Sequence, residues 1–386
     1  MSVTIGVPLE TDERETRVAL VPSVVERYRA LGATIVLQRG AGQRSWFGDD
    51  QYDGVTLVDA AADVFSADIV LKVKSPTLNE VGLLQSGTVV VGLLQPYTAL
   101  DVVAALRDRD VTSFALELLP RITRAQSMDA LTSQASIAGY KAALLAASLS
   151  GRYFPMLTTA AGTLRPARVV VLGAGVAGLQ AIATARRLGA LVEAYDVRAA
   201  TRDQVHSLGA RFIDVGVDAE SSGGYARELT PEEQTRVQEI IDRHLVDADV
   251  VITTAAVPGR QAPRLVSAEV VERMKPGAVI IDLATETGGN VALTRPGERY
   301  VTRNGVTLYG PLNVAAMVPT HASEQYAHNL LNFIAPHLQA GELHLDWSDE
   351  VLAASVLTRD GEVPNAAIAE RLRRQEGRVL AEVDAA

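Results

Sequence analysis

The stretch "VVVLGAGVAGLQAIATARRLGALVEAYDVRAA", residues 169–200, decides the fold of this chain. A β-branched run leads into Gly173, Gly175 and Gly178, and a helix-forming segment follows directly. In such a unit the first glycine allows a tight turn, the second lets the backbone approach a pyrophosphate, and the third lets helix and strand pack closely. The N–H groups at the start of the helix favour phosphates. The stretch therefore predicts the first strand–helix–strand unit of a dinucleotide-binding domain.

The second strand of this unit ends in Asp196. A carboxylate there accepts hydrogen bonds from an adenosine ribose and repels a 2′-phosphate, which favours NAD(H) over NADP(H). Arg198 argues in the other direction, since it could meet a 2′-phosphate. The alternative, in which the glycines only satisfy a strand-to-helix turn, is less favoured because glycines, strands, helix and terminal acid occur together.

Short apolar runs alternate with helix-period segments along the whole chain, which is typical of parallel sheets flanked by helices. The first series of expected strands is 3–7, 33–38, 68–74, 88–94 and 111–116. The second series is 168–175, 191–196, 210–215, 248–254, 277–284 and 306–310. We therefore expect an α/β protein of two Rossmann-like, doubly wound parallel-sheet domains with an NAD cleft between them.

Two helices are expected to connect these domains. The first has an apolar stripe at helical spacing, made of Leu131, Ala135, Ala138, Ala142, Leu145 and Leu149. The return helix, 323–338, places four large residues on one side, namely Tyr326, Leu330, Phe333 and Ile334. The prediction is a discontinuous N-terminal domain, 1–132 plus 322–386, and an NAD(H)-binding domain, 133–321. From Gly216 to about Thr235 no periodicity is clear, which indicates a long loop.

Composition excludes several classes of function. The chain has 386 residues and a formal net charge of −10, which argues against a broad nucleic-acid-binding face. It has no cysteine, so disulfides, thiolate catalysis and cysteine-ligated zinc are excluded, and no metal-binding motif is visible. We expect no secretory signal, because the first residues show no basic segment followed by an apolar run. The uncharged segment 81–100 is interpreted as a helix end, a turn and a buried strand, so we expect no membrane insertion.

Three further groups could carry function. Segment 120–134, "PRITRAQSMDALTSQ", is dense in hydrogen-bonding side chains that suit a nicotinamide, but Ser127 or Asp129 could equally be a helix cap and the arginines a solvated loop. The pair Gly223 and Gly224 before Tyr225 suggests a hinged flap, with an ordinary surface loop favoured on spacing alone.

A keto acid could bind cations in the first domain, at Arg17 and at Lys72 or Lys74, although we favour their being surface charges at strand and helix ends. All six histidines follow residue 205, so the first domain is expected to offer no imidazole for acid/base chemistry.

The whole chain resembles the family of NAD(H)-binding soluble components of proton-translocating NAD(P) transhydrogenases, which is homologous to alanine dehydrogenase. The resemblance rests on "PRITRAQSMDALTSQASIAGYKAALLAA", the glycine stretch above, "GGYAREL", "TTAAVPGRQAP" and "MKPGAVIIDLATETGGN". "RAQSMD" and "GGYAREL" are distinctive of the transhydrogenase. Alanine dehydrogenase needs a catalytic histidine where this chain has Gln95 in "LLQPYTAL".

The resemblance implies which residues contact the cofactor. At the nicotinamide end, where Arg121, Gln126 and Asp129 are also expected to take part in catalysis, they are Arg121, Ile122, Gln126, Asp129 and, less securely, Thr132. At the adenosine end they are Gly173, Ala174, Gly175, Val176, Gly178, Asp196, Val197 and Arg198, so Arg198 is compatible with NAD. The flap contributes Gly224 and Tyr225, and a further backbone contact comes from Ala256.

The same resemblance implies a function and partners. Hydride would pass between NADH and NADP⁺ on a partner, without a general acid or base. The chain would be a homodimeric peripheral subunit on the cytoplasmic face of the membrane, working with a membrane-spanning subunit that conducts protons and an NADP(H)-binding subunit. Two alternatives stay open: an alanine dehydrogenase-type enzyme that uses Arg17 and Lys72 or Lys74, and a non-catalytic NAD-responsive binding protein.

Overall fold

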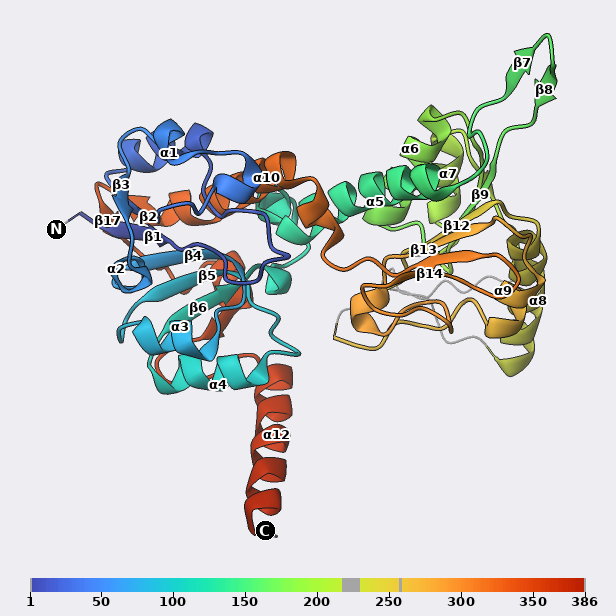
Figure 1. Ribbon diagram of the computed structural model, residues 1–386. Coiled ribbons are helices and arrows are strands. Elements are labelled where there is room, and N and C mark those ends of the chain that lie inside the picture. Colours follow the sequence, from blue (N-terminus) through green and yellow to red (C-terminus); the bar gives the residue numbers. More distant parts are fainter. Residues whose placement is uncertain (1, 217–229, 257–258, 385–386) are drawn as a thin grey trace. The chain divides into compact units, whose positions relative to one another are not determined.

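The computed structural model describes residues 2–216, 230–256 and 259–384. The chain separates into two compact units: unit 1 comprises Met1–Gln134 with Val318–Ala386, and unit 2 comprises Ala135–Met317. Within the described residues each unit has one seven-stranded sheet, visible in Figure 1. The helix α5, Ala130–Leu149, runs through the first boundary between the units.

In unit 1 the strand order is β18-β6-β5-β4-β1-β2-β3. The strands are β1 Thr4–Val7, β2 Thr34–Gln38, β3 Thr56–Val58, β4 Ile69–Lys74, β5 Val89–Leu93, β6 Thr112–Ala115 and β18 Val356–Thr358. The helices are α1 Pro22–Ala30, α2 Ala61–Phe65, α3 Leu78–Leu83, α4 Leu100–Asp108, α10 Pro319–Ile334, α11 Glu350–Ser355 and α12 Ala366–Asp384. A short strand pair, β16 Leu338–Gln339 and β17 Glu342–Leu343, follows α10. From β3 to β6 this is the doubly wound order 3-2-1-4-5-6.

Alternating apolar residues cover both faces of this sheet. Along β4, Ile69, Leu71 and Val73 join the core under α1, α10 and α11, whereas Val70 joins the core under α3, α4 and α12. The return helix is central to the first core, because the predicted set of large residues is buried: Tyr326, Leu330, Phe333 and Ile334. Continuous Val/Ile/Leu runs are what strands buried on both faces require.

Tyr326 also bridges two strands. Its hydroxyl donates to the carbonyl of Lys72 at 2.7 Å and accepts from the N–H of Leu93 at 3.2 Å. The register of β4 and β5 shifts between Leu71 and Lys74, so the phenol completes hydrogen bonding where the ladder is interrupted.

In unit 2 the strand order is β11-β10-β9-β12-β13-β15-β14, which is again 3-2-1-4-5-6 with one added strand. The strands are β9 Arg168–Leu172, β10 Leu191–Tyr195, β11 Arg211–Phe212, β12 Val250–Thr253, β13 Val279–Asp282, β14 Arg299–Val301 and β15 Thr307–Tyr309. The helices are α6 Val176–Arg187, α7 Thr201–Ser207, α8 Pro231–Val246 and α9 Ala268–Arg273. Residues of α5, α6 and α7 pack on one face, and those of α8 and α9 on the other.

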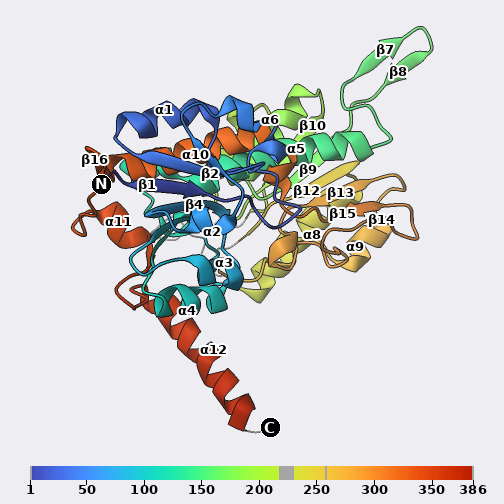
Figure 2. The same ribbon diagram turned by 60° about the vertical axis from the view of Figure 1, so that its left-hand side comes forward.

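Both expected series of strands are present, and the prediction of two doubly wound α/β sheets is confirmed. The sheets are not wholly parallel, because β14 and β18 are antiparallel edge strands that the sequence patterns did not predict. A hairpin of β7, Leu157–Thr159, and β8, Gly162–Leu164, was also missed, and it projects from unit 2 in Figures 1 and 2.

Two predictions about helices were wrong in detail. Helix α8 already begins at Pro231, inside the expected loop, because Thr230 and Glu233 form a reciprocal capping box. In α5, Leu131 is exposed, although it was predicted to belong to the apolar stripe. The fully buried residues in the second half of the helix are Ala142, Ala143 and Ala146, and only Ala142 of these belongs to the predicted stripe.

Segment 81–100 has the structure expected for a globular core. It contains the end of α3, a turn and the buried strand β5. Among the residues that the structure describes, no helix combines the length and apolar character needed to cross a membrane.

Candidate functional site

The glycine turn after β9 leaves no room for side chains at two positions. Gly173 has φ +100°, which favours glycine, and a Cβ built on it would lie 2.6 Å from Oγ1 of Thr254. A Cβ on Gly178 would lie 1.8 Å from the carbonyl oxygen of Gly173. The first turn of α6 therefore packs directly on the turn that precedes it.

The start of α6 has the backbone features that favour an anion. Gly175 is its N-cap, and among the described residues no side chain caps the helix there. The N–H groups of the first turn, together with the helix dipole, can therefore serve a phosphate ligand. A cramped glycine turn and an uncapped helix start fit the pyrophosphate of a dinucleotide.

Asp196 lies at the end of β10, against this turn. Its buried carboxylate accepts hydrogen bonds from the N–H of Ala174 at 2.7 Å and of Arg198 at 2.9 Å, and from the Arg198 guanidinium at 2.9 Å through both Nε and Nη2. Burial raises the pKa of Asp196, but the bonds from Arg198 and Ala174 outweigh burial and hold the pKa below its ordinary value. The group is an anion at neutral pH.

The loop after β12 is joined to the glycine turn. Oγ1 of Thr254 donates to the carbonyl of Gly173 at 3.1 Å. The fully buried Asn290 accepts from the N–H of Ala255 at 3.0 Å and donates to its carbonyl at 2.8 Å, which fixes the peptide beside the exposed Ala256. Strands β9 and β12 are neighbours where the strand order reverses, and this is where doubly wound sheets bind ligands.

Thr254 and Asn290 were not assigned roles from the sequence, although both lie in segments quoted for the resemblance. The predicted adenosine set, in contrast, comes together around one turn of unit 2. Val176 and Val197 are both exposed there.

The predicted nicotinamide segment lies in unit 1, in and around the 3-10 helix η4, Thr123–Met128. Arg121 and Gln126 are exposed, and Ile122 packs against the core. The carboxylate of Asp129 accepts from the N–H of Thr132 at 2.8 Å and from its hydroxyl at 2.6 Å. Asp129 thus caps α5, one of the two roles that the sequence left open.

This segment is held in place and is not a loose solvated loop. Arg124 forms a bidentate pair with Asp349, with nitrogen–oxygen distances of 2.7 and 2.5 Å. From α10, Asn329 and Asn332 both donate to the carbonyl of Ser127, at 2.9 and 3.1 Å. The backbone that presents Gln126 is therefore anchored by the C-terminal segment of the chain.

The preference for surface charges at Arg17 and Lys72 was wrong. Lys72 is 1% exposed and pairs with Glu80 at 2.9 Å and with Glu10 at 3.3 Å. Arg17 is 6% exposed and pairs with Glu15 at 2.7 Å. Burial of each cation is possible because carboxylates lie within ion-pair distance: Glu10 and Glu80 for Lys72, and Glu15 for Arg17.

Lys74 is half-buried and pairs with Asp12 at 2.7 Å. The predicted flap residues, Gly224 and Tyr225, lie outside the described residues.

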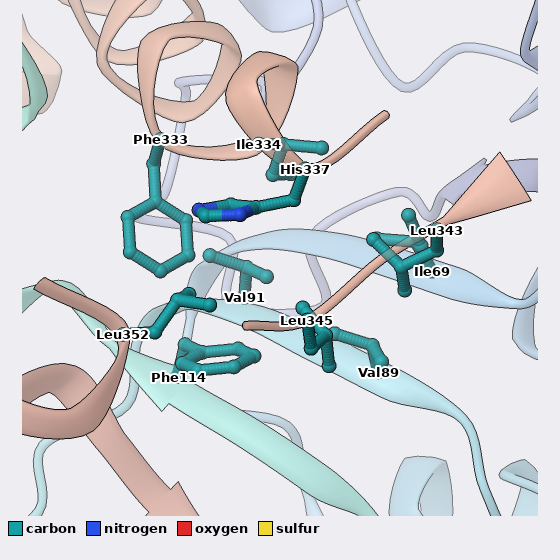
Figure 3. Close-up of a pocket in the computed structure, with 10 residues that line it drawn as sticks. All are labelled: Ile69, Val89, Val91, Phe114, Phe333, Ile334, His337, Leu343, Leu345 and Leu352. Carbon is teal, nitrogen blue, oxygen red and sulfur yellow. The ribbon is translucent and has the colours of Figure 1, made fainter. Parts of the chain in front are cut away.

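The expectation that the N-terminal domain offers no imidazole was also wrong. The returning chain brings four histidines into unit 1, namely His321, His328, His337 and His344. His337 lines a small pocket that is otherwise apolar, between Phe333 and the strands β4 to β6 (Figure 3). Burial lowers the pKa of His337, so its imidazole is neutral at pH 7.

Comparison with known proteins agrees with this geometry. The models of the alanine dehydrogenase/PNT N-terminal and C-terminal domains match residues 6–138 and 142–366. An NAD(P) transhydrogenase alpha subunit of Rhodospirillum rubrum is 46% identical over 94% of this chain and 98% of its own length. Alanine dehydrogenase of Bacillus subtilis is 28% identical over 95% of this chain and 94% of its own.

The crystal structure of transhydrogenase from Sinorhizobium meliloti matches with a TM-score of 0.85 at 43% identity, and the match covers 93% of this chain and 99% of that one. The resemblance drawn from the sequence motifs is thereby confirmed. A family of this kind implies binding of a nicotinamide dinucleotide, which the glycine turn and Asp196 fit. The chain belongs to the alanine dehydrogenase/PNT family.

Proposed function

We propose that the chain binds NAD(H) and passes hydride between it and NADP(H) held by a partner, as the NAD(H)-binding subunit of a proton-translocating NAD(P) transhydrogenase. The observation that carries the proposal is the ionised Asp196 beside the glycine turn of unit 2, because a carboxylate there selects a ribose without a 2′-phosphate. The similarity to relatives named as transhydrogenase alpha subunits supports the choice of reaction.

The proposal assigns the two halves of the cofactor to different residues. The glycine turn would hold the pyrophosphate and Asp196 the adenosine ribose, with Ala256 and the flap residues Gly224 and Tyr225 as further contacts. Arg121, Gln126 and Asp129 would orient the nicotinamide, helped by Ile122 and Thr132. The bound nicotinamide supplies the hydride chemistry, and the protein supplies position and exclusion of water.

Asp129 would act through its fixed position, because its carboxylate is already held by Thr132. The anchoring of η4 by Arg124 and by α10 favours a rigid surface for orienting a ring.

The partners would be a membrane-spanning subunit that conducts protons and an NADP(H)-binding subunit, with this chain as a homodimer at the cytoplasmic face of the membrane. Residues 133–321 would form the NAD(H)-binding domain, and residues 1–132 with 322–386 the other domain. The relatives named transhydrogenase subunit alpha support the existence of partner subunits.

A direct test begins with titration of the purified chain with NADH and NADPH. We expect a clear preference for NADH and a loss of about tenfold in NADH affinity for Asp196→Asn, since hydrogen bonds to a charged group contribute about 1.5–3 kcal/mol. Asp203→Asn is the matched control, because Asp203 is an exposed carboxylate on the neighbouring α7. Equal affinity of both variants for NADH would contradict the assignment of Asp196.

The reaction is tested in the same cuvette. Addition of pyruvate and ammonia should leave NADH unoxidised, whereas the membrane and NADP(H)-binding components should start hydride transfer. Rapid oxidation by pyruvate and ammonia alone would identify an alanine dehydrogenase despite Gln95. Binding of NADH with no transfer under either condition would indicate an NAD-responsive binding protein.

A further inference from the structure

We propose that Arg198 competes with the adenosine ribose of NAD(H) for the carboxylate of Asp196 and must be displaced when the cofactor binds. This inference rests on the proposed function, because it concerns how the same site admits its ligand. It changes the role of Arg198 from a simple cofactor contact to an internal competitor of the ribose.

The first observation is that the carboxylate of Asp196 is saturated. A carboxylate offers about four lone-pair positions. On Oδ1 they are taken by the N–H and Nε of Arg198, and on Oδ2 by the N–H of Ala174 and Nη2 of Arg198. With these four bonds in place, Asp196 has no position left for a hydroxyl.

The second observation concerns space. Gly175 is the glycine that lets a dinucleotide approach the backbone. Apart from Gly175 and its two chain neighbours, the described residues offer one heavy atom within 4 Å of a Cβ built there, Nη2 of Arg198 at 3.9 Å. The guanidinium therefore lies beside the opening that the glycine provides, as well as on the carboxylate.

The positions that the Arg198 guanidinium would vacate on the carboxylate of Asp196 match the hydroxyls of a ribose. If the guanidinium leaves, one position becomes available on each carboxylate oxygen, while the two backbone N–H bonds from Ala174 and Arg198 remain. The 2′- and 3′-hydroxyls of a ribose are a pair of adjacent donors that can occupy one position on each oxygen. The side chain of Arg198 is 42% exposed, so it can move into solvent without crossing a packed core.

The test uses the full chain and compares three variants. Arg198→Gln removes the charge, and Arg198→Lys keeps the charge but cannot occupy both oxygens, because an ammonium is a point donor. Arg202→Gln is the matched control: Arg202 is 44% exposed and forms its own 2.9 Å ion pair with Asp214. Dissociation constants for NADH and 5′-AMP are measured by calorimetry, and thermal unfolding verifies that each variant is folded.

We expect Arg198→Gln to bind both ligands about two- to fivefold more tightly than the wild type, which is the size of a partly exposed ion pair. Arg198→Lys should shift affinity in the same direction, and Arg202→Gln should leave it unchanged. Unchanged or weaker binding by Arg198→Gln, with NADH still bound by the wild type, would overturn this inference alone. A wild-type chain that binds no NADH would overturn the proposed function and the inference together.

Discussion

Substitution of Gly178 by alanine tests the link between the glycine turn and cofactor binding. The new Cβ would lie 1.8 Å from the carbonyl oxygen of Gly173, whereas ordinary contact begins at 3.4 Å. The difference, 3.4 minus 1.8, means that turn and helix must separate by about 1.6 Å. Because the obstructing atom belongs to the backbone, no side chain can rotate away, and we expect a loss of about 1–3 kcal/mol in the free energy of unfolding. The displaced turn should also lower NADH affinity at least tenfold.

The matched control is Gly377→Ala. Gly377 lies inside α12 with nothing within 4 Å of a built Cβ, so alanine should stabilise that helix by up to about 1 kcal/mol and leave NADH affinity unchanged. Unfolding should be followed by far-UV circular dichroism. Both tryptophans, Trp46 and Trp347, belong to unit 1, so tryptophan fluorescence would not report on unit 2, which contains Gly178. If Gly178→Ala binds NADH within twofold of the wild type, the turn does not hold the cofactor as we argue.

Three other substitutions probe how the rest of the chain is held. The hydrogen bond from Arg124 lowers the pKa of Asp349 to about 2. The wild type should therefore be more stable than Asp349→Asn by a difference that is complete above about pH 4 and disappears as the pH falls through about 2. Urea unfolding across this range measures the difference, and a difference that does not change with pH would refute the prediction. Lys72→Met leaves two buried carboxylates without their cation and should reduce the free energy of unfolding by about 3–5 kcal/mol. Lys74→Met, at a more exposed ion pair, should cost less than about 1 kcal/mol. Denaturant titrations measure both losses, and similar losses for the two variants would contradict the burial argument. Gly139→Ala would place a Cβ 2.0 Å from the carbonyl oxygen of Ala177, so thermal unfolding should show about 1–3 kcal/mol of destabilisation, and an unchanged midpoint would show that α5 and α6 can separate freely.

The parallel strands and the glycine turn could be predicted, because local sequence patterns encode them. The buried parallel strands appear as Val- and Ile-rich runs, and the glycine spacing specifies the turn that the structure contains. The antiparallel edge strands β14 and β18 were missed because each has only three residues, too few to show alternation. The start of α8 was missed although its capping box is visible in the sequence, because the glycines before it indicate a loop.

The sequence could not predict contacts between side chains that are distant along the chain. Nothing near Lys72 in the sequence indicates that Glu10 will reach it, so a charged residue looked like a surface residue. Arg124 pairs with Asp349 across more than half the chain. Asp196 was predicted to be the ribose acceptor, but its saturation by Arg198 depends on side-chain geometry that the sequence does not show.

The discontinuity of unit 1 has a consequence for synthesis. Its core needs the large side chains of α10, such as Tyr326 and Phe333, and its sheet needs β18 at the edge. These segments leave the ribosome only after all of unit 2, which is continuous in sequence and can close its own core earlier. We therefore expect the N-terminal strands to remain incompletely packed, with apolar faces exposed, until the last segment of the chain emerges. A nascent chain stalled before residue 318 should then be protected from proteolysis in unit 2 and remain sensitive in the segment made first.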